Sequence, residues 1–132
     1  MHTDLDIDQI TYGNEARLPG SESDLQKVCA EYLDYLKVLY FHPPNGGLRN
    51  LKEAARFKAE GVKPGVSDLV ILEPRADRHG LMVELKVGKN TLSDYQVEYL
   101  RACWRRGYAV AVCYTFDAFK AVVDRYLKNA AI

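Results

Sequence analysis

The sequence lacks any uncharged apolar run close to the roughly 18–20 residues that a bilayer requires, so it predicts no membrane segment. It also has few cysteines, three in 132 residues, and none of them stands in a CxxC or other metal-binding spacing. We therefore expect reduced thiols in the core of a cytoplasmic protein rather than a disulfide framework. A basic segment is missing at the N-terminus, where acidic residues stand instead, and this predicts that no secretory signal is present.

Charge of one sign is not in excess, because 18 basic residues balance 18 acidic ones. The balance is uneven along the chain: residues 1–24 hold six acids and one base, a net charge of −5, which leaves +5 on the other 108 residues. The mildly basic remainder of the chain can bind a phosphate backbone, although charge alone neither indicates nor excludes nucleic acid as a partner. With 48% hydrophobic and 11% aromatic residues, the composition is that of one folded domain rather than a disordered chain.

Hydrophobic periodicity places a long amphipathic helix over residues 22–40, with Ser21 or Ser23 as its N-cap. Residues 1–20 are expected to form an N-terminal extension with little regular structure. Beyond the first helix, composition and periodicity predict a loop at 41–48, a short basic helix at 50–60, strands at 69–72 and 81–87 joined as a hairpin, a helix at 93–106, a strand at 108–114 and a helix at 117–128. This order indicates an α/β domain over residues 21–132, in which a mixed central sheet contains one antiparallel hairpin and one crossover through a helix.

The residues with the most chemistry stand on the predicted hairpin. Glu84 and Lys86 are two apart on a strand, so their side chains point to the same face of the sheet. If the connection at 73–80 is centred near residues 76–77, cross-strand partners have numbers that sum to about 153. Asp68 then lies within about one residue of Glu84, and two carboxylates and one lysine converge at the ends of adjacent strands.

Two carboxylates that reach one point repel each other unless a cation lies between them. Hard oxygen ligands on a rigid scaffold favour Mg²⁺ or Mn²⁺, and such a cation acidifies a water and neutralises charge on a phosphoryl oxygen. A neighbouring lysine can orient the attacking water, so the implied reaction is metal-assisted phosphodiester hydrolysis. The alternative interpretation is a solvent-facing pair of charges, because Glu-x-Lys is common on strands by chance. The three scattered histidines disfavour a nuclease that uses a histidine base.

The ordered combination of short motifs resembles the PD-(D/E)xK nuclease superfamily, and more narrowly its VRR-NUC (virus-type replication-repair nuclease) domain. The resemblance covers residues from about 21 to 115 and rests on Glu22 in the first helix, Asn45-Gly46, Gly61, Gly65, Asp68, Glu84-x-Lys86 and Gln96. One residue departs from the pattern, since Ser67 stands where the superfamily usually has proline before the aspartate.

The resemblance implies a restriction-endonuclease-like core and a role for each matching residue. Asp68 and Glu84 would hold Mg²⁺ or Mn²⁺ together with the Leu85 carbonyl, and Lys86 would address the attacking water. Glu22 would reach the metal from the first helix. The implied activity is that of a metal-dependent DNA endonuclease that acts on branched DNA in replication, recombination or repair. Similar stand-alone domains imply a homodimer, which would cut a Holliday junction in opposed strands as a resolvase does.

Two of these residues have a purely structural alternative. Glu22 is an acid in the first turn of a helix, where it complements the helix dipole. Gln96 completes the pattern Ser93-x-x-Gln96, which is typical of a capping box. Both interpretations of each residue remain open from the sequence.

A group of polar and basic residues near these motifs is predicted to contact DNA: Asn45, Arg49, Lys52, Arg56, Lys63 and Lys89. Basic side chains contact phosphates, although a solvated helix face is the commoner meaning of such a run. Two further alternatives for function remain open. The chain could be a module that binds nucleic acid or protein without cutting, or a nuclease that processes RNA.

Overall fold

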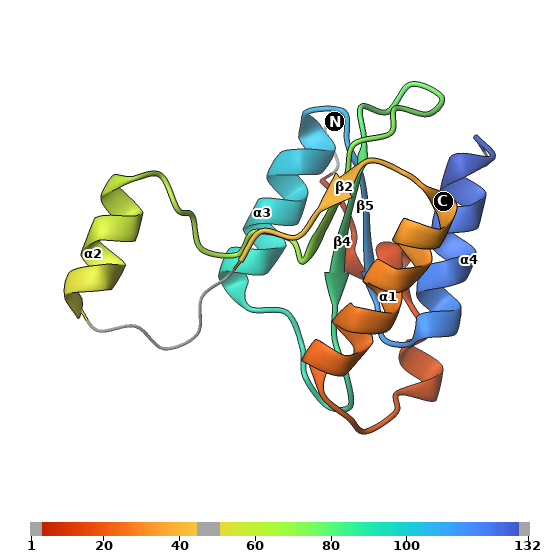
Figure 1. Ribbon diagram of the computed structural model, residues 1–132, viewed down its shortest axis with the longest axis horizontal. Helices are drawn as coiled ribbons and strands as arrows, with labels where there is room; N and C mark the ends of the chain where they lie inside the picture. The colour runs from red at the N-terminus through yellow and green to blue at the C-terminus, as the bar shows by residue number, and fades with distance from the viewer. Residues whose placement is uncertain (1–3, 45–50, 130–132) are drawn as a thin grey trace.

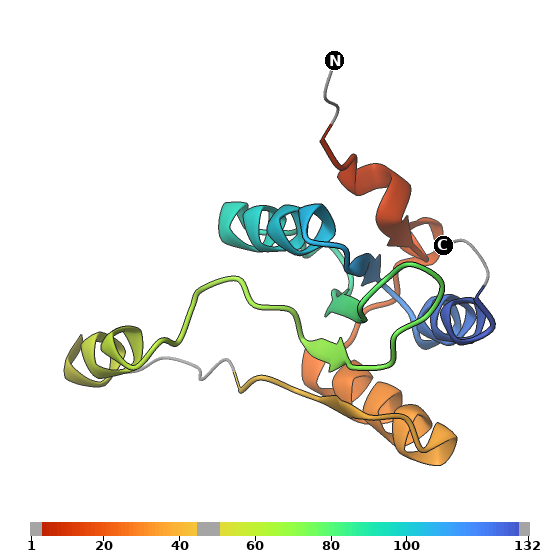
Figure 2. The same ribbon diagram turned by 90° about the horizontal axis from the view of Figure 1, so that it is seen from above.

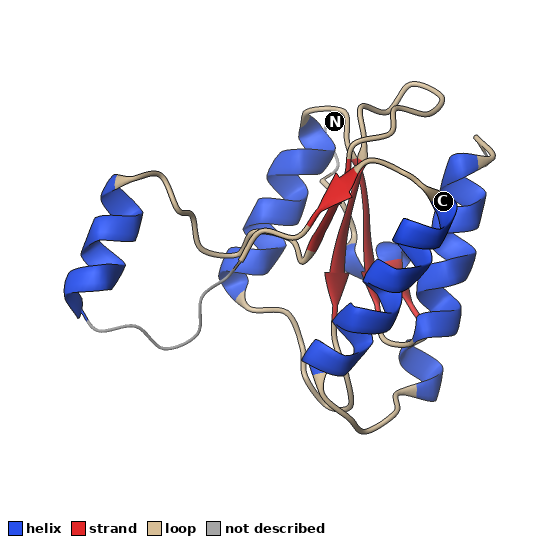
Figure 3. Cartoon of the chain, in the orientation of Figure 1, coloured by secondary structure: helices blue, strands red, loops and turns tan. Residues whose placement is uncertain are grey.

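The fold is known from a computed structural model, which describes residues 4–44 and 51–129. A five-stranded mixed sheet, in the order β1-β5-β4-β3-β2, forms its centre. The strands are β1 (Thr11–Tyr12), β2 (Tyr40–Phe41), β3 (Leu69–Ile71), β4 (Leu81–Leu85) and β5 (Ala109–Cys113). The helices are α1 (Glu22–Leu36), α2 (Leu51–Ala59), α3 (Asp94–Arg105) and α4 (Phe116–Leu127). Helices α1 and α4 cover one face of the sheet and α3 covers the other (Figures 1, 2 and 3).

The sheet has the predicted hairpin and crossover. Strand β3 pairs antiparallel with β4 in a register where Leu69 faces Val83, so partner numbers sum to 152, close to the predicted 153. Strands β4 and β5 are parallel and are joined through α3. The expected α/β architecture, with a mixed central sheet flanked by helices, is therefore confirmed.

Alternation along the strands divides the core into two layers. Val83 and Leu85 pack toward α1 and α4, where Leu33 and Phe119 are fully buried. Residues of opposite parity on the strands, among them Val70, Met82 and Val112, pack under α3 against Leu100 and Cys103. Glu84 has the parity of Met82 and therefore belongs to the α3 side. All three cysteines are buried and free.

Helix α1 begins as predicted but ends earlier. The Ser21 hydroxyl accepts a hydrogen bond from the Asp24 backbone N–H at 2.9 Å, the expected N-cap contact. The helix ends at Leu36 rather than residue 40, because Lys37 adopts a left-handed conformation with φ of 61°. The chain then reverses into the edge strand β2, which the sequence analysis assigned to the end of the helix and a loop.

The expectation of little regular structure before residue 20 is wrong. Two 3₁₀ helices, η1 (Ile7–Ile10) and η2 (Asn14–Ala16), flank strand β1, which pairs parallel with β5. Leu5 and Ile10 are buried in the layer under α3, and Asp4 forms an ion pair with Arg105. These contacts join residues far apart in the sequence, which local periodicity does not report. The division between an extension at 1–20 and a domain at 21–132 remains a prediction.

Helix α2 stands away from the sheet (Figures 1 and 2). It contains no buried residue, and the exposed Leu51 side chain retains 89% of its accessible surface. Its C-terminal loop returns to β3 through Gly61, whose φ of 101° is left-handed. Within the described part of the chain, no helix is long and apolar enough to span a membrane.

Candidate active site

Asp68 and Glu84 meet at the end of the hairpin. Asp68 directly precedes β3, and one further step of the observed register places it opposite Glu84. The Asp68 Oδ2 atom accepts a hydrogen bond from the Leu85 backbone N–H at 2.7 Å. The Leu85 backbone thus lies beside Asp68 and directly follows Glu84, and a role for its carbonyl as a metal ligand remains a prediction.

Glu84 is a buried acid with an unsatisfied oxygen. It is 2% exposed, and its Oε2 atom has no hydrogen-bond partner among the described residues. Burial raises the pKa of Glu84 to about 10, and the neighbouring Asp68 carboxylate adds to the increase. The positive charge of Lys86 opposes this increase in pKa, and the charge of Glu22 adds to it slightly. In the absence of a cation, the site therefore favours the protonated form of Glu84.

These residues fit a hard divalent cation. An unsatisfied, buried carboxylate oxygen beside a second carboxylate is an arrangement that a positive charge stabilises. The described residues contain no group of three or more His, Cys, Asp or Glu side chains arranged to hold a metal. Two carboxylates and a backbone oxygen would suit Mg²⁺, because this ion usually keeps several of its waters.

Lys86 follows the last residue of β4 and is only 7% exposed. Its backbone N–H donates to the Cys113 carbonyl at 3.1 Å, which continues the pairing of β4 with β5. Alternation directs its side chain to the face of Glu84, and its charge lowers the pKa of that acid. The arrangement is not an exposed pair of charges, because both side chains are buried.

Gln96 forms the predicted capping box and also contacts the buried acid. Its Oε1 atom accepts from the Ser93 backbone N–H at 2.9 Å, and its own N–H donates to the Ser93 hydroxyl at 3.2 Å, which completes the capping box. The other end of the same amide, Nε2, donates to Glu84 Oε1 at 3.0 Å. Capping therefore orients the amide so that its donor faces the buried acid.

Glu22 is hydrogen-bonded to Asn90, a residue near the site that the sequence did not predict. Asn90, in the loop after β4, donates from Nδ2 to Glu22 Oε2 at 2.9 Å. The Asn90 carbonyl accepts from the Tyr114 hydroxyl at 2.7 Å, and the Arg17 guanidinium lies 4.2 Å from the centre of the Tyr114 ring. No sequence motif signals Asn90, because its partners are distant along the chain.

The segment before Asp68 is held against the first turn of α3. Gly65 has a φ of 79°, and a Cβ atom there would lie 2.4 Å from the Tyr95 carbonyl oxygen, so only glycine fits. Ser67, at the position where the superfamily usually has proline, is fully buried. The ring Nδ1 of His42 contacts the Asp68 carbonyl, which places one of the three histidines beside the site.

The described part of the chain includes four of the six residues that are predicted to contact DNA. Lys52, Arg56, Lys63 and Lys89 are all exposed, the first two on the projecting helix α2 and the others in loops that adjoin the site. Asn45 and Arg49 lie outside the described residues. Contact of any of these side chains with DNA remains a prediction.

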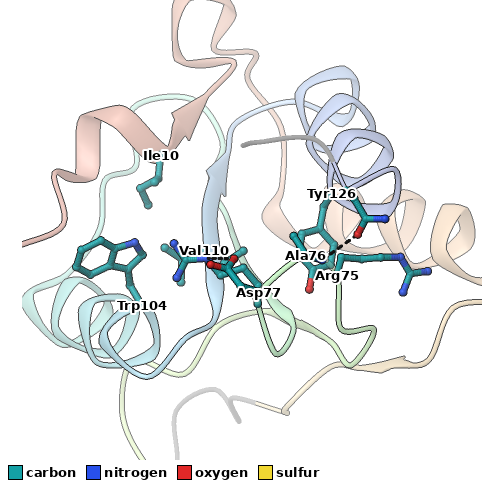
Figure 4. A pocket seen from close by; sticks show the side chains of 10 residues that line it. Ile10, Arg75, Ala76, Asp77, Trp104, Val110 and Tyr126 are labelled. Atoms are coloured by element: carbon teal, nitrogen blue, oxygen red, sulfur yellow. Dashed lines mark hydrogen bonds and ion pairs between the residues drawn. The ribbon is translucent and has the colours of Figure 1, made fainter.

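A hollow of about 310 Å³ lies at the opposite end of the sheet, around the hairpin turn and the start of β5. Figure 4 shows Trp104 and Tyr126 on opposite sides of it. The Tyr126 hydroxyl donates to the Glu73 carbonyl, and the Arg75 Nε donates to the Leu127 carbonyl. These lining groups serve the fold, and the hollow is separate from the carboxylate site.

Comparison with known proteins points to one family. The family model of the VRR-NUC domain matches residues 18–117, which include every predicted metal ligand. A solved "VRR_NUC domain protein" superposes with a TM-score of 0.70 at 29% identity, covering 86% of this chain and 93% of the other. A second, a "VRR_NUC domain", has a TM-score of 0.52 at 22% identity, covers 80% of this chain and 96% of the other, and supports the fold alone. The search of curated proteins found no significant match.

Proposed function

Because the chain belongs to the VRR-NUC domain family, a family of nuclease-type domains, we propose that it is a Mg²⁺- or Mn²⁺-dependent endonuclease that hydrolyses phosphodiester bonds in branched DNA. The observation that carries the proposal is the buried Glu84 beside the partly buried Asp68, with the buried Lys86 directly after the strand that carries Glu84. This is a charge arrangement that folding alone does not favour, since burial and the negative charge of Asp68 both oppose ionisation of Glu84. Such an arrangement is typical of a site built for chemistry.

Asp68, Glu84 and the Leu85 carbonyl would hold the cation. The chemistry supplied by the bound cation is neutralisation of charge on the scissile phosphate and a lower pKa for the attacking water. Glu22, which accepts a hydrogen bond from Asn90 at 2.9 Å, would contact the metal through a bound water. Gln96 acts as a positioning residue, because its Nε2 fixes the orientation of the Glu84 carboxylate.

Lys86 orients the attacking water and stabilises the charge that develops on the phosphate. Its side chain is buried beside Glu84, so its ammonium group acts at low solvent exposure, where its electrostatic effect is larger than in water. An arginine at this position would be less effective, because its guanidinium group is larger and planar, whereas the ammonium group of lysine is compact.

Four exposed basic side chains would contact the phosphate backbone of the substrate: Lys52, Arg56, Lys63 and Lys89. A homodimer would present two such sites, so opposed strands of a four-way junction could be cut together.

The test is cleavage of end-labelled four-way junction, flap and linear DNA in Mg²⁺, Mn²⁺ or EDTA, with the same strands made of RNA in parallel. Cleavage of branched DNA that requires the cation is expected. Asp68→Asn should abolish it, and Lys86→Met should slow it by about 100-fold or more.

Matched controls are Asp77→Asn, at a hairpin-tip aspartate whose side chain is 95% exposed, and Lys27→Ala, at an exposed lysine of α1. Both should cut at the wild-type rate. Activity that persists in Asp68→Asn would contradict the proposal. Preferential cleavage of RNA would reassign the substrate, and salt-dependent binding without cleavage in Mn²⁺ would indicate a binding module.

A further inference from the structure

Two exposed aromatic side chains border the carboxylate site. Tyr95, in the first turn of α3, is 67% exposed, and Phe41, on the edge strand β2, is 48% exposed. Large aromatic side chains contribute most to stability when buried. Exposed aromatic side chains beside a reactive site are therefore candidates for contact with a bound molecule.

Tyr95 is fixed between the two segments that supply the acids. Its backbone carbonyl packs against Gly65, three residues before Asp68. The next residue along α3, Gln96, donates its side-chain hydrogen bond to Glu84. The backbone of Tyr95 is therefore held in place by the site, while its ring remains open to solvent.

Phe41 lies on the same face of the sheet as the two acids. It pairs with Val70, which in turn pairs with Met82, and both of these partners are buried under α3. Its neighbour Tyr40 packs into the opposite layer, as alternation requires. The following residue, His42, contacts the Asp68 carbonyl, so Phe41 is one residue from a direct contact with the site.

We propose that Tyr95 and Phe41 are stacking surfaces for unpaired bases that flank the scissile phosphate, and that they select DNA with unpaired nucleotides at this point. The inference rests on the proposed nuclease function and specifies its substrate. Bases inside a duplex have their faces covered by their neighbours, whereas an unpaired base has a free face to place on an aromatic ring.

The surrounding charge supports a nucleic acid as the occupant rather than a protein. Lys63 and Lys89 are exposed in the loops that lead from α2 to Asp68 and from β4 to α3. Exposed aromatic rings beside basic side chains are typical of surfaces that bind single-stranded nucleic acid. Phosphates on either side of a stacked base would meet these two lysines.

Exposure alone does not carry the proposal, as Tyr35 demonstrates. This tyrosine on α1 is 79% exposed, but it stacks on Tyr32 on the other face of the sheet, with ring centroids 6.4 Å apart. Tyr35 is therefore the matched control: a tyrosine of similar exposure that is remote from the acids.

The experiment measures affinity by fluorescence anisotropy in EDTA, where no strand is cut. The probes are a duplex that carries a single-stranded flap with 2-aminopurine at the branch, and the same duplex fully paired. Tyr95→Ala and Phe41→Ala should each weaken flap binding by about 5- to 100-fold, the loss expected for one stacked base. Binding to the paired duplex should change less than twofold. Tyr95→Phe should retain flap binding, and Tyr35→Ala should match the wild type.

Stacking should also quench the 2-aminopurine fluorescence in the wild type and in Tyr95→Phe but not in Tyr95→Ala. Equal losses for flap and duplex, no loss for either, or no affinity for DNA at all would overturn the inference. Cleavage that prefers branched DNA and is unchanged in Tyr95→Ala would refute this inference alone. Tyr95-dependent flap binding without cleavage in Mn²⁺ would refute the nuclease proposal alone.

Discussion

Gln96 donates a hydrogen bond from Nε2 to Glu84 Oε1 at 3.0 Å, while its Oε1 caps the helix that begins beside it. One side chain therefore connects the first turn of α3 to the strand that carries the buried acid. Because an amide has a donor end and an acceptor end, the capping contact determines which end faces Glu84. The helix N-terminus acts in this way as a support for the proposed metal ligand.

The two members of the capping box should separate stability from activity. Ser93→Ala removes the N-cap acceptor and should lower the free energy of unfolding by about 1 kcal/mol with little change in cleavage. Gln96→Ala removes the donor to Glu84 and should reduce cleavage by about tenfold and raise the Mg²⁺ concentration needed for half-maximal rate. Thermal unfolding and metal titrations of the cleavage rate check both. Equal effects of the two variants on activity would count against the positioning role.

Without metal, the buried Glu84 should make the fold less stable as pH rises. Its pKa is raised from 4.5 to about 10, so the folded state holds a proton more tightly than the unfolded chain between these values. The stabilisation by the protonated acid is complete below about pH 4.5 and is lost progressively up to about pH 10. Glu84→Gln should therefore melt at a higher temperature than the wild type at pH 8 in EDTA, and the difference should shrink toward pH 5. A difference independent of pH would contradict this account.

A divalent cation should reverse this loss of stability at high pH. Mg²⁺ or Mn²⁺ binds the folded state, so it should raise the melting temperature at pH 8 in proportion to the logarithm of its concentration above the dissociation constant. The increase should be smaller at pH 5.5, where protons compete for Glu84. Scanning calorimetry of the wild type, Asp68→Asn and Asp77→Asn checks this. The increase should vanish only in Asp68→Asn, and an equal increase in all three would point to non-specific binding.

Asn90 should act on catalysis through Glu22. Its Nδ2 atom holds the Glu22 carboxylate, so Asn90→Ala and Glu22→Gln should each reduce cleavage by several-fold, and the double variant should be no slower than Glu22→Gln alone. A double-mutant cycle on the rate at saturating substrate measures this coupling. Losses that simply multiply would show that Asn90 acts independently of Glu22.

The sequence predicts contacts that depend on local spacing better than contacts between distant segments. Ser21 and Ser93 mark the true starts of their helices, and the hairpin register differs from expectation by one, because caps and alternation are properties of short stretches. The contact of Gly65 with Tyr95 and that of Glu22 with Asn90 depend on how whole elements pack. The N-terminal strand β1 was missed for the same reason, since it pairs with β5, which lies far along the sequence. The roles of the site residues themselves remain predictions.

The most direct test of the central claim is anomalous diffraction from a crystal soaked in Mn²⁺. The account predicts a peak bound by the Asp68 and Glu84 carboxylates and the Leu85 carbonyl, and its loss in Asp68→Asn crystals. A Mn²⁺ ion bound only elsewhere, or Asp68 and Glu84 side chains that turn toward separate regions with no shared ligand, would contradict it.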